Sequence, residues 1–323
     1  MNRCIGKVVG ALLTGLGLIG VAQAQTWPTQ PIHIVVPYGP GGNTDTVGRV
    51  LAEGLAKELG QPVVVDNRPG ATALIGTNYV AAAEPDGYTF LLNTISLVIS
   101  PHVFKSIEGD LASKFEPVSQ IAAISKVLVV NPSLPVKSVA ELVDYAKQSQ
   151  QPLTYGSTGV GSANHLVAEL FSMHMGIPLT HVPYKGSSPA ITDLIGNQIT
   201  LIFEDLPPAV PFIKDGRLKA LLVASPERSK ALPDVPSAGE QGMDALIVEP
   251  WNGVLAPKGT PANIVAAMDK AIQKVVASED YRRRLTQAGA EPVYQSSADY
   301  GKFIQAESQR WGDVVKKAGI PKQ

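Results

Sequence analysis

Short apolar runs alternate along the chain with longer segments in which apolar residues recur at helical spacing. The first pair is a β-branched run at 32–36 and a segment at 45–59 in which Val47, Leu51 and Leu55 recur every four residues. The alternation continues with predicted strands at 63–65 and 88–92 and an alanine-rich helix that ends at 83. Strands that alternate with helices predict an α/β fold built on a parallel sheet.

The same alternation starts again at residue 127. It predicts strands at 127–130, 154–155, 181–182, 200–203 and 218–223, and helices at 139–147, 162–175 and 189–194. A strand at 253–255 is then followed by predicted helices at 261–277, 279–288 and 298–318. We expect a chain that enters a second domain and returns, with domain 1 at 25–126 and 250–323 and domain 2 at 127–249. The cleft between the two domains is the expected ligand site.

The N-terminal segment has the pattern of an export signal. Arg3 and Lys7 precede an apolar run at 8–21, and Ala22-Gln23-Ala24 follows with the small-x-small spacing of a cleavage site. The run is shorter than the ~20 residues that a bilayer crossing requires. We therefore expect cleavage before Gln25 and an exported, periplasmic protein.

Composition narrows the possible functions. The only cysteine, Cys4, lies within the predicted signal, so the mature chain has neither disulfides nor cysteine chemistry. The chain has 27 basic and 28 acidic residues, and loss of Arg3 and Lys7 leaves 25 basic residues and a net charge of −3. This balance, without long runs of like charge, provides no electrostatic footprint for nucleic acid.

The most informative motif is a glycine-rich loop at 37–45 between the first strand and the first helix. Glycines allow backbone to approach a ligand closely, and free amides at a helix start favour an anion. The loop lacks the Gly-Lys-Ser/Thr ending of a phosphate loop and differs from the dinucleotide fingerprint. Its candidate ligand residues are Tyr38, Gly41, Gly42, Asn43 and Asp45. The structural alternative is a tight turn in which Thr44 or Asp45 caps the helix.

A matching loop at 155–162 occupies the same place in the second unit. Its hydroxyl groups and amides suit a carboxylate without a buried cation. The candidates are Ser157, Thr158, Gly161 and Ser162, with His165 in the following helical turn to orient the loop. Alternatively, Ser162 is a helix cap and the glycines are turn residues.

The motifs and their order resemble the Bug receptors, the TctC-like substrate-binding components of tripartite tricarboxylate transporters. Besides the two loops, the resemblance rests on Asn67-Arg68-Pro69-Gly70-Ala71, Pro85-Asp86-Gly87-Tyr88-Thr89, His181-Val182-Pro183-Tyr184-Lys185-Gly186 and Trp251-Asn252-Gly253-Val254. It implies a periplasmic, two-domain type II periplasmic-binding-protein fold that closes on a small carboxylate and delivers it to membrane subunits. We expect a monomer without a cofactor. One departure is Ala71-Thr72-Ala73-Leu74, where relatives commonly have more glycine, so the turn geometry there is open.

Three places are candidates for recognition of the rest of the ligand. Asn93, Thr94 and Ser96 follow a first-domain strand, and Tyr184 and Lys185 lie in the second domain. Glu204 and Asp205 end another strand, where an acid could hold a ligand ammonium or hydroxyl group. Alternatively, Asp205 caps a helix that begins at residue 206. The sequence leaves open whether the ligand is a dicarboxylate, a tricarboxylate, an aromatic acid or an amino acid.

Catalysis has little support in the sequence. His165 and Glu169 share the i to i+4 spacing of metal ligands, but a third ligand in register is missing, so no metal site is predicted. The segment around Ser157 does not form the Gly-x-Ser-x-Gly of a nucleophile elbow. We expect His33, His102, His174 and His181 to be scattered and structural. The interpretation is a receptor rather than an enzyme, and the alternatives are a carboxylate sensor for a signalling partner or an exported hydrolase.

Overall fold

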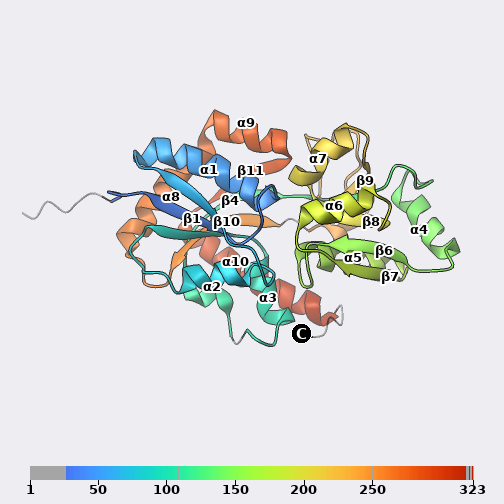
Figure 1. Ribbon diagram of the computed structural model, residues 1–323, viewed down its shortest axis with the longest axis horizontal. Helices are drawn as coiled ribbons and strands as arrows, with labels where there is room; N and C mark the ends of the chain where they lie inside the picture. Colours follow the sequence, from blue (N-terminus) through green and yellow to red (C-terminus); the bar gives the residue numbers. More distant parts are fainter. Residues whose placement is uncertain (1–26, 108, 249, 318–319, 321, 323) are drawn as a thin grey trace, which may run out of the picture.

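The molecule has two lobes that lie side by side along its long axis (Figure 1). The computed structural model describes residues 27–323 except 108, 249, 318, 319, 321 and 323. The predicted signal and its cleavage site lie outside the described residues. Within the described residues, no helix is both long enough and apolar enough to span a membrane.

The first lobe is built on a six-stranded sheet in the order β11-β4-β10-β3-β1-β2. Its strands are β1 (Ile32–Val36), β2 (Val63–Asn67), β3 (Thr89–Asn93), β4 (Phe115–Ile124), β10 (Trp251–Pro257) and β11 (Ala290–Gln295). Strand β1 is parallel to β2 and β3, whereas β10 is antiparallel to both β3 and β4. Strand β11 is antiparallel to β4.

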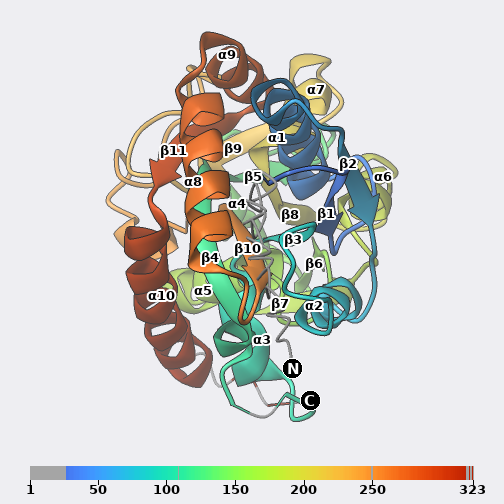
Figure 2. The same ribbon diagram turned by 90° about the vertical axis from the view of Figure 1, so that its left-hand side faces the viewer.

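Helices cover both faces of this sheet (Figure 2). They are α1 (Asn43–Leu59), α2 (Leu74–Ala81), α3 (Ser96–Val103), the 3-10 turn η1 (Leu111–Lys114), α8 (Ala262–Ala277), α9 (Glu279–Ala288) and α10 (Ser297–Lys317). Successive side chains of a strand point to opposite faces. Ile34 accordingly packs with the apolar residues of α1, α8 and α9, whereas Val35 packs in the cluster that contains α3 and α10.

The second lobe has a five-stranded sheet in the order β7-β6-β8-β5-β9. Its strands are β5 (Lys126–Val130), β6 (Leu153–Ser157), β7 (Leu179–Pro183), β8 (Leu201–Asp205) and β9 (Lys219–Val223). Its helices are α4 (Val139–Gln148), α5 (Ala163–Met175), α6 (Ser187–Ile195), α7 (Leu206–Lys214) and the 3-10 turn η2 (Asp244–Leu246). Strand β6 is parallel to β7 and β8, but β5 is antiparallel to β8 and β9.

The α/β class is therefore confirmed, but each predicted parallel sheet also contains antiparallel strands. β5 is the strand by which the chain enters the second lobe and β10 the strand by which it returns, and each runs against its neighbours. The pattern also missed β4 and β11, in which Pro117 and Pro292 interrupt the apolar alternation, and α3, which contains Pro101.

Two neighbouring segments connect the lobes. The chain leaves β4 through Ser125 directly into β5, and it returns just before β10. The two segments are joined by a hydrogen bond of 2.6 Å from the Ile124 amide to the Pro250 carbonyl. Paired crossing segments of this kind are a natural place for a hinge, because few other backbone bonds need to change when the lobes rotate.

Candidate ligand-binding site

The first glycine loop has an open approach beside its backbone. Helix α1 begins at Asn43 rather than at residue 45, and Gly42 is its N-cap with no side-chain hydrogen bond to the helix. The alternative in which Thr44 or Asp45 caps α1 is therefore wrong. A Cβ built on Gly41 would meet nothing within 4 Å, and one built on Gly42 would meet only the Gly39 carbonyl, at 3.7 Å.

Asp45 shapes this loop. Its Oδ2 accepts hydrogen bonds from the Gly41 amide (2.9 Å) and Arg49 Nε (3.0 Å), and its Oδ1 accepts one from Asn67 Nδ2 (3.0 Å). Burial acts to raise the pKa of Asp45, but the bonds from Arg49, Gly41 and Asn67 outweigh it and hold the pKa below its usual value. Both carboxylate oxygens thus fix the loop, and contact between Asp45 and a ligand stays a prediction.

The predicted residues at the ends of β1 and β3 form one hydroxyl cluster. The Tyr38 hydroxyl lies 2.5 Å from Ser96 Oγ and 3.1 Å from Thr94 Oγ1, and it donates to Asn93 Oδ1 at 3.3 Å. Asn93 is buried and donates in turn to Thr77 Oγ1 at 3.0 Å. The structure therefore brings Tyr38, Asn93 and Thr94 together beside the first loop.

Asn43 connects this loop to the strand that returns from the second lobe. Its Nδ2 donates to Asn252 Oδ1 (3.2 Å), and Asn252 Nδ2 donates to Thr44 Oγ1 (3.3 Å). The Oδ1 atom of Asn43 is buried without a hydrogen-bond partner in the described part of the chain. Asn252 was not predicted as a site residue, although it is part of the Trp251-Asn252-Gly253 motif.

The second glycine loop is held from inside by buried side chains. Ser157 Oγ is fully buried, accepts from the Gly159 amide (3.1 Å) and lies 2.6 Å from His181 Nε2. His165 Nδ1 accepts from the Gly161 amide at 3.0 Å. His165 thus contacts the loop backbone, as its predicted orienting role requires, and the neutral ring carries its proton on Nε2.

Ser162 is the N-cap of α5, because its Oγ accepts from the His165 amide at 3.3 Å. The alternative in which Ser162 is a helix cap is therefore correct. A hydroxyl that accepts one hydrogen bond can still donate another, so a contact with an anion remains compatible with the cap. Thr158 Oγ1 donates to Asn164 Oδ1 at 3.3 Å, which connects the loop to deeper polar residues.

His181 is not scattered, contrary to expectation. Its ring stacks on His165 with centroids 4.2 Å apart, and Tyr155 stacks against His181 at 4.9 Å. Burial lowers the pKa of His165 to about 4, and burial together with the neighbouring His165 lowers the pKa of His181 to about 4. Both rings are therefore neutral at pH 7 and form a packed support under the second loop.

Tyr184 and Asp205 have partners within the second lobe. The Tyr184 hydroxyl donates to Asp193 Oδ2 at 2.7 Å, and burial, reinforced by this acceptor, raises the pKa of Tyr184 to about 12. Asp205 occupies the N-cap position of α7 but makes no side-chain cap bond. It accepts instead from Lys126 Nζ at 2.6 Å, a buried lysine that the sequence analysis missed because it opens the apolar run of β5.

The lobes touch each other around the two loops. A Cβ built on Gly159 would lie 3.4 Å from Thr72 Oγ1 of the first lobe, and one built on Gly161 would lie 2.8 Å from Val103 Cγ1. The segment after β2 and the last residue of α3 therefore pack closely on the second glycine loop. The two lobes are therefore in contact at this edge.

The segment that departs from the glycine-rich pattern is strained. Ala71, Thr72 and Ala73 have φ angles of 47°, 51° and 74°. This left-handed region suits glycine, and side chains there cost roughly 1–2 kcal/mol per residue. Strain of this kind persists where surrounding contacts determine the conformation, and Thr72 lies at the contact between the lobes.

We expect Ala71→Gly to raise the free energy of unfolding by about 0.5–1 kcal/mol, because it removes left-handed strain from an exposed alanine. Ala82→Gly is the matched control, since Ala82 is also exposed at an end of α2 but has an ordinary φ of −100°. It should lower the free energy of unfolding by a similar amount. Urea unfolding of both variants measures the difference, and equal destabilisation would contradict strain at Ala71.

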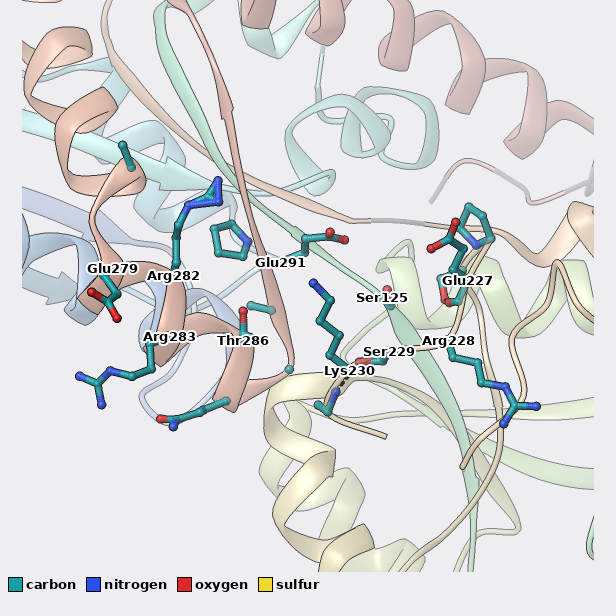
Figure 3. Close-up of a pocket in the computed structure, with 18 residues that line it drawn as sticks. Ser125, Glu227, Arg228, Ser229, Lys230, Glu279, Arg282, Arg283, Thr286 and Glu291 are labelled. Atoms are coloured by element: carbon teal, nitrogen blue, oxygen red, sulfur yellow. Dashed lines mark hydrogen bonds between the residues drawn. The ribbon is translucent and has the colours of Figure 1, made fainter. Parts of the chain in front are cut away.

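A cavity of about 890 Å³ lies elsewhere (Figure 3). It is lined by Ser125, by residues 225–231 of the second lobe, and by α9 and the start of β11 in the first. The first glycine loop lies on the β3-β1-β2 side of the first sheet, and the second glycine loop lies on the β7-β6-β8 side of the second sheet. The cavity is lined by segments on the β11-β4 side of the first sheet and on the β9 side of the second. The cavity and the loops therefore lie on opposite sides of the crossing segments.

The structure gives little support to the hydrolase alternative. Ser157 and His181 are in contact, but Ser157 is fully buried and its hydroxyl is engaged by the loop backbone. A substrate therefore cannot reach this oxygen in the arrangement described. Among the described residues, no group of three or more histidine, cysteine, aspartate or glutamate side chains is arranged to hold a metal ion.

Comparison with known proteins gives a consistent result. The family model described as tripartite tricarboxylate transporter family receptor matches residues 47–320. Protein BugT of Bordetella pertussis is 36% identical over 321 residues, which cover 99% of this chain and 98% of BugT. The periplasmic binding protein BugD superposes with a TM-score of 0.87 at 33% identity, over 92% of this chain and all of BugD (100%). The R. palustris protein Rpa4515 with adipate gives a TM-score of 0.88 at 37% identity, covering 92% and 100% of the two chains.

Proposed function

Because the chain belongs to the tripartite tricarboxylate transporter family of receptors, we propose that it captures a small carboxylate between its lobes and delivers it to membrane subunits of such a transporter. The family is one of solute-binding receptors with a two-domain α/β fold, and not a family of enzymes. The predicted resemblance to Bug receptors is thereby confirmed. A periplasmic location is part of the proposal, supported by the BugD likeness and by the export pattern at the N-terminus.

The observation that carries the proposal is the pair of glycine loops, one from each lobe. The first loop leads into α1, a helix of 17 residues whose N-terminus has no side-chain cap. Uncapped amides at a helix start favour an anion. The second loop adds the hydroxyls of Thr158 and Ser162, and it contacts the first lobe where Gly159 approaches Thr72. A carboxylate bound by both loops would connect the lobes.

Two domains that rotate about the crossing segments would provide the transport signal. A ligand shifts an open–closed equilibrium by its greater affinity for the closed form. In this mechanism the closed form is the one that the membrane subunits recognise. Adipate bound to Rpa4515, which is 37% identical, supports a small carboxylate as the ligand class.

The direct test is a thermal-shift screen of the mature chain against aliphatic, hydroxylated, amino and aromatic carboxylates, followed by calorimetry and solution scattering. A binding carboxylate should raise the melting temperature and reduce the radius of gyration. Binding without any change in dimensions would argue against closure, and stabilisation only by non-carboxylate solutes would contradict the ligand class.

Gly42→Ala should weaken affinity for the carboxylate found in the screen at least tenfold and leave the melting temperature nearly unchanged. The φ of −80° at Gly42 tolerates a side chain, and the added methyl meets only the Gly39 carbonyl at 3.7 Å. The methyl would therefore obstruct the ligand and not the fold. Gly301→Ala in α10 is the control, with an ordinary contact to Pro117 at 3.5 Å and no place in either loop. If both variants bind with native affinity in calorimetric titration, the first loop does not hold the ligand.

A further inference from the structure

A buried cluster of charged and polar residues lies next to the second glycine loop. Lys126 Nζ, almost completely buried, donates to Asp205 Oδ1 (2.6 Å) and to Asn164 Oδ1 (2.8 Å). Glu204 Oε1 accepts from Ser187 Oγ (2.9 Å), the Asp205 amide (2.8 Å) and Asn164 Nδ2 (3.3 Å). The cluster contains two acids and one cation.

The cluster faces the ligand site. Asn164 also accepts from Thr158 Oγ1, so the cluster continues directly into the second loop. Asp205 is the partly exposed acid of this cluster, with 18% of its side chain accessible. The cluster therefore adjoins the site at the second loop.

Asp205 retains capacity to accept a hydrogen bond. Lys126 binds its Oδ1, whereas its Oδ2 has no hydrogen-bond partner among the described residues, and the side chain is 18% exposed. Directly behind it, Glu204 is fully buried and its Oε2 also has no partner in that part of the chain. Two acceptor oxygens are thus unused at this end of the site.

The cations that hydrogen-bond to the cluster and to the first loop already have acidic partners. Lys126 is paired with Asp205, and Arg49, the cation beside the first loop, is paired with Asp45. A second carboxylate at the cluster would meet Asp205 and Glu204 at short range in a poorly solvated environment. Like charges in such surroundings are strongly unfavourable.

We propose that the ligand is a carboxylate whose far end carries a hydrogen-bond donor, a hydroxyl or an ammonium group, which Asp205 accepts. This inference rests on the proposed function, since it assigns the ligand carboxylate to the glycine loops. It makes Asp205 the residue that determines specificity, with Lys126 as the group that positions it. An ammonium or hydroxyl group donates a hydrogen bond to Asp205 Oδ2. A carboxylate leaves this oxygen without a donor and is repelled by its charge.

The experiment compares ligands of equal length that differ only at the far end. The mature protein is titrated by calorimetry at pH 7.5 with succinate, glutarate and adipate, and with the matched ω-hydroxy and ω-amino monocarboxylates. At the length that binds best, we expect the hydroxy or amino acid to bind at least tenfold more tightly than the dicarboxylate. A dicarboxylate that binds more tightly than the ω-hydroxy and ω-amino monocarboxylates of the same length overturns the inference and leaves the proposed function intact. Absence of binding by every carboxylate contradicts both.

Asp205→Asn provides an independent readout on the same ligands. The substitution keeps the shape of the side chain and frees the charge of Lys126, so the preference for a donor should fall at least tenfold or reverse toward the dicarboxylate. Asp215→Asn is the control, because Asp215 is exposed at the opposite end of α7 and is not part of the cluster. An unchanged preference in a folded Asp205→Asn protein would contradict the role of Asp205.

Discussion

Replacement of Lys126 by methionine is expected to lower the free energy of unfolding by about 3–5 kcal/mol, because it leaves buried acids without their cation. Burial and the Asp205 charge already raise the pKa of Glu204, and Lys126 acts in the opposite direction. Loss of Lys126 should therefore raise the pKa of Glu204 further. Acidification protonates the carboxyl, so the deficit should be smaller at pH 5 than at pH 8.

Arg228→Met is the matched control for this prediction. Arg228 pairs with Glu240, and both side chains are more than 40% exposed, at 44% and 43%. Surface ion pairs of this kind contribute about 0–1 kcal/mol. The double variant Lys126→Met, Asp205→Asn should be less destabilised than Lys126→Met alone, since it also removes a buried charge. Equal urea-unfolding free energies for Lys126→Met and Arg228→Met would contradict a buried, charge-balanced cluster.

The stacked histidines predict a second large effect, a loss of stability in acid. Their pKa values of about 4 in the native state lie below the ordinary value of about 6.5, so the unfolded chain binds protons first as the pH falls. The stabilisation is complete above pH 6.5, declines between pH 6.5 and 4, and falls no further below pH 4. The expected total loss is on the order of 2–4 kcal/mol, discounted because His181 is only partly buried.

Protonation of His165 in the folded protein removes the acceptor for the Gly161 amide, so carboxylate affinity should weaken only as the pH approaches 4. Urea unfolding from pH 7.5 to 4 measures the stability, and His181→Gln should flatten the decline. His174→Gln, at an exposed position in α5 away from the stack, should retain it. An identical decline in wild type and His181→Gln would assign the acid sensitivity to other groups.

Local patterns were sufficient to predict the two glycine loops and most helices. Glycine clusters between a β-branched run and a helical run indicate loops whose backbone a ligand can approach closely. Ser162 indicates the start of α5 because it is the N-cap of that helix. Helix α9 has the predicted bounds, Glu279–Ala288, because Ser278 caps it and Gly289 ends it in a left-handed conformation. These features depend on neighbours within a few residues.

The remaining features depend on contacts between distant residues. Asn43 and Asn252 are 209 positions apart, and Lys126 and Asp205 are 79 apart, so neither pair leaves a local signal. The direction of β5 and β10 depends on how the chain crosses between lobes, which apolar periodicity does not encode. Likewise, the left-handed backbone at Ala71, Thr72 and Ala73 runs against the preference of each residue and is set by tertiary packing.

The cavity behind the crossing segments has a consequence for how carboxylate affinity can be controlled from a second site. If the lobes rotate about those segments, walls contributed by both lobes must move apart on one side as they approach on the other, so the cavity of about 890 Å³ differs between the two states. A side chain or small molecule that fits the closed-state cavity would then act as a second effector without touching the carboxylate. Thermodynamic reciprocity requires that the bound carboxylate change the affinity for that effector by the same factor.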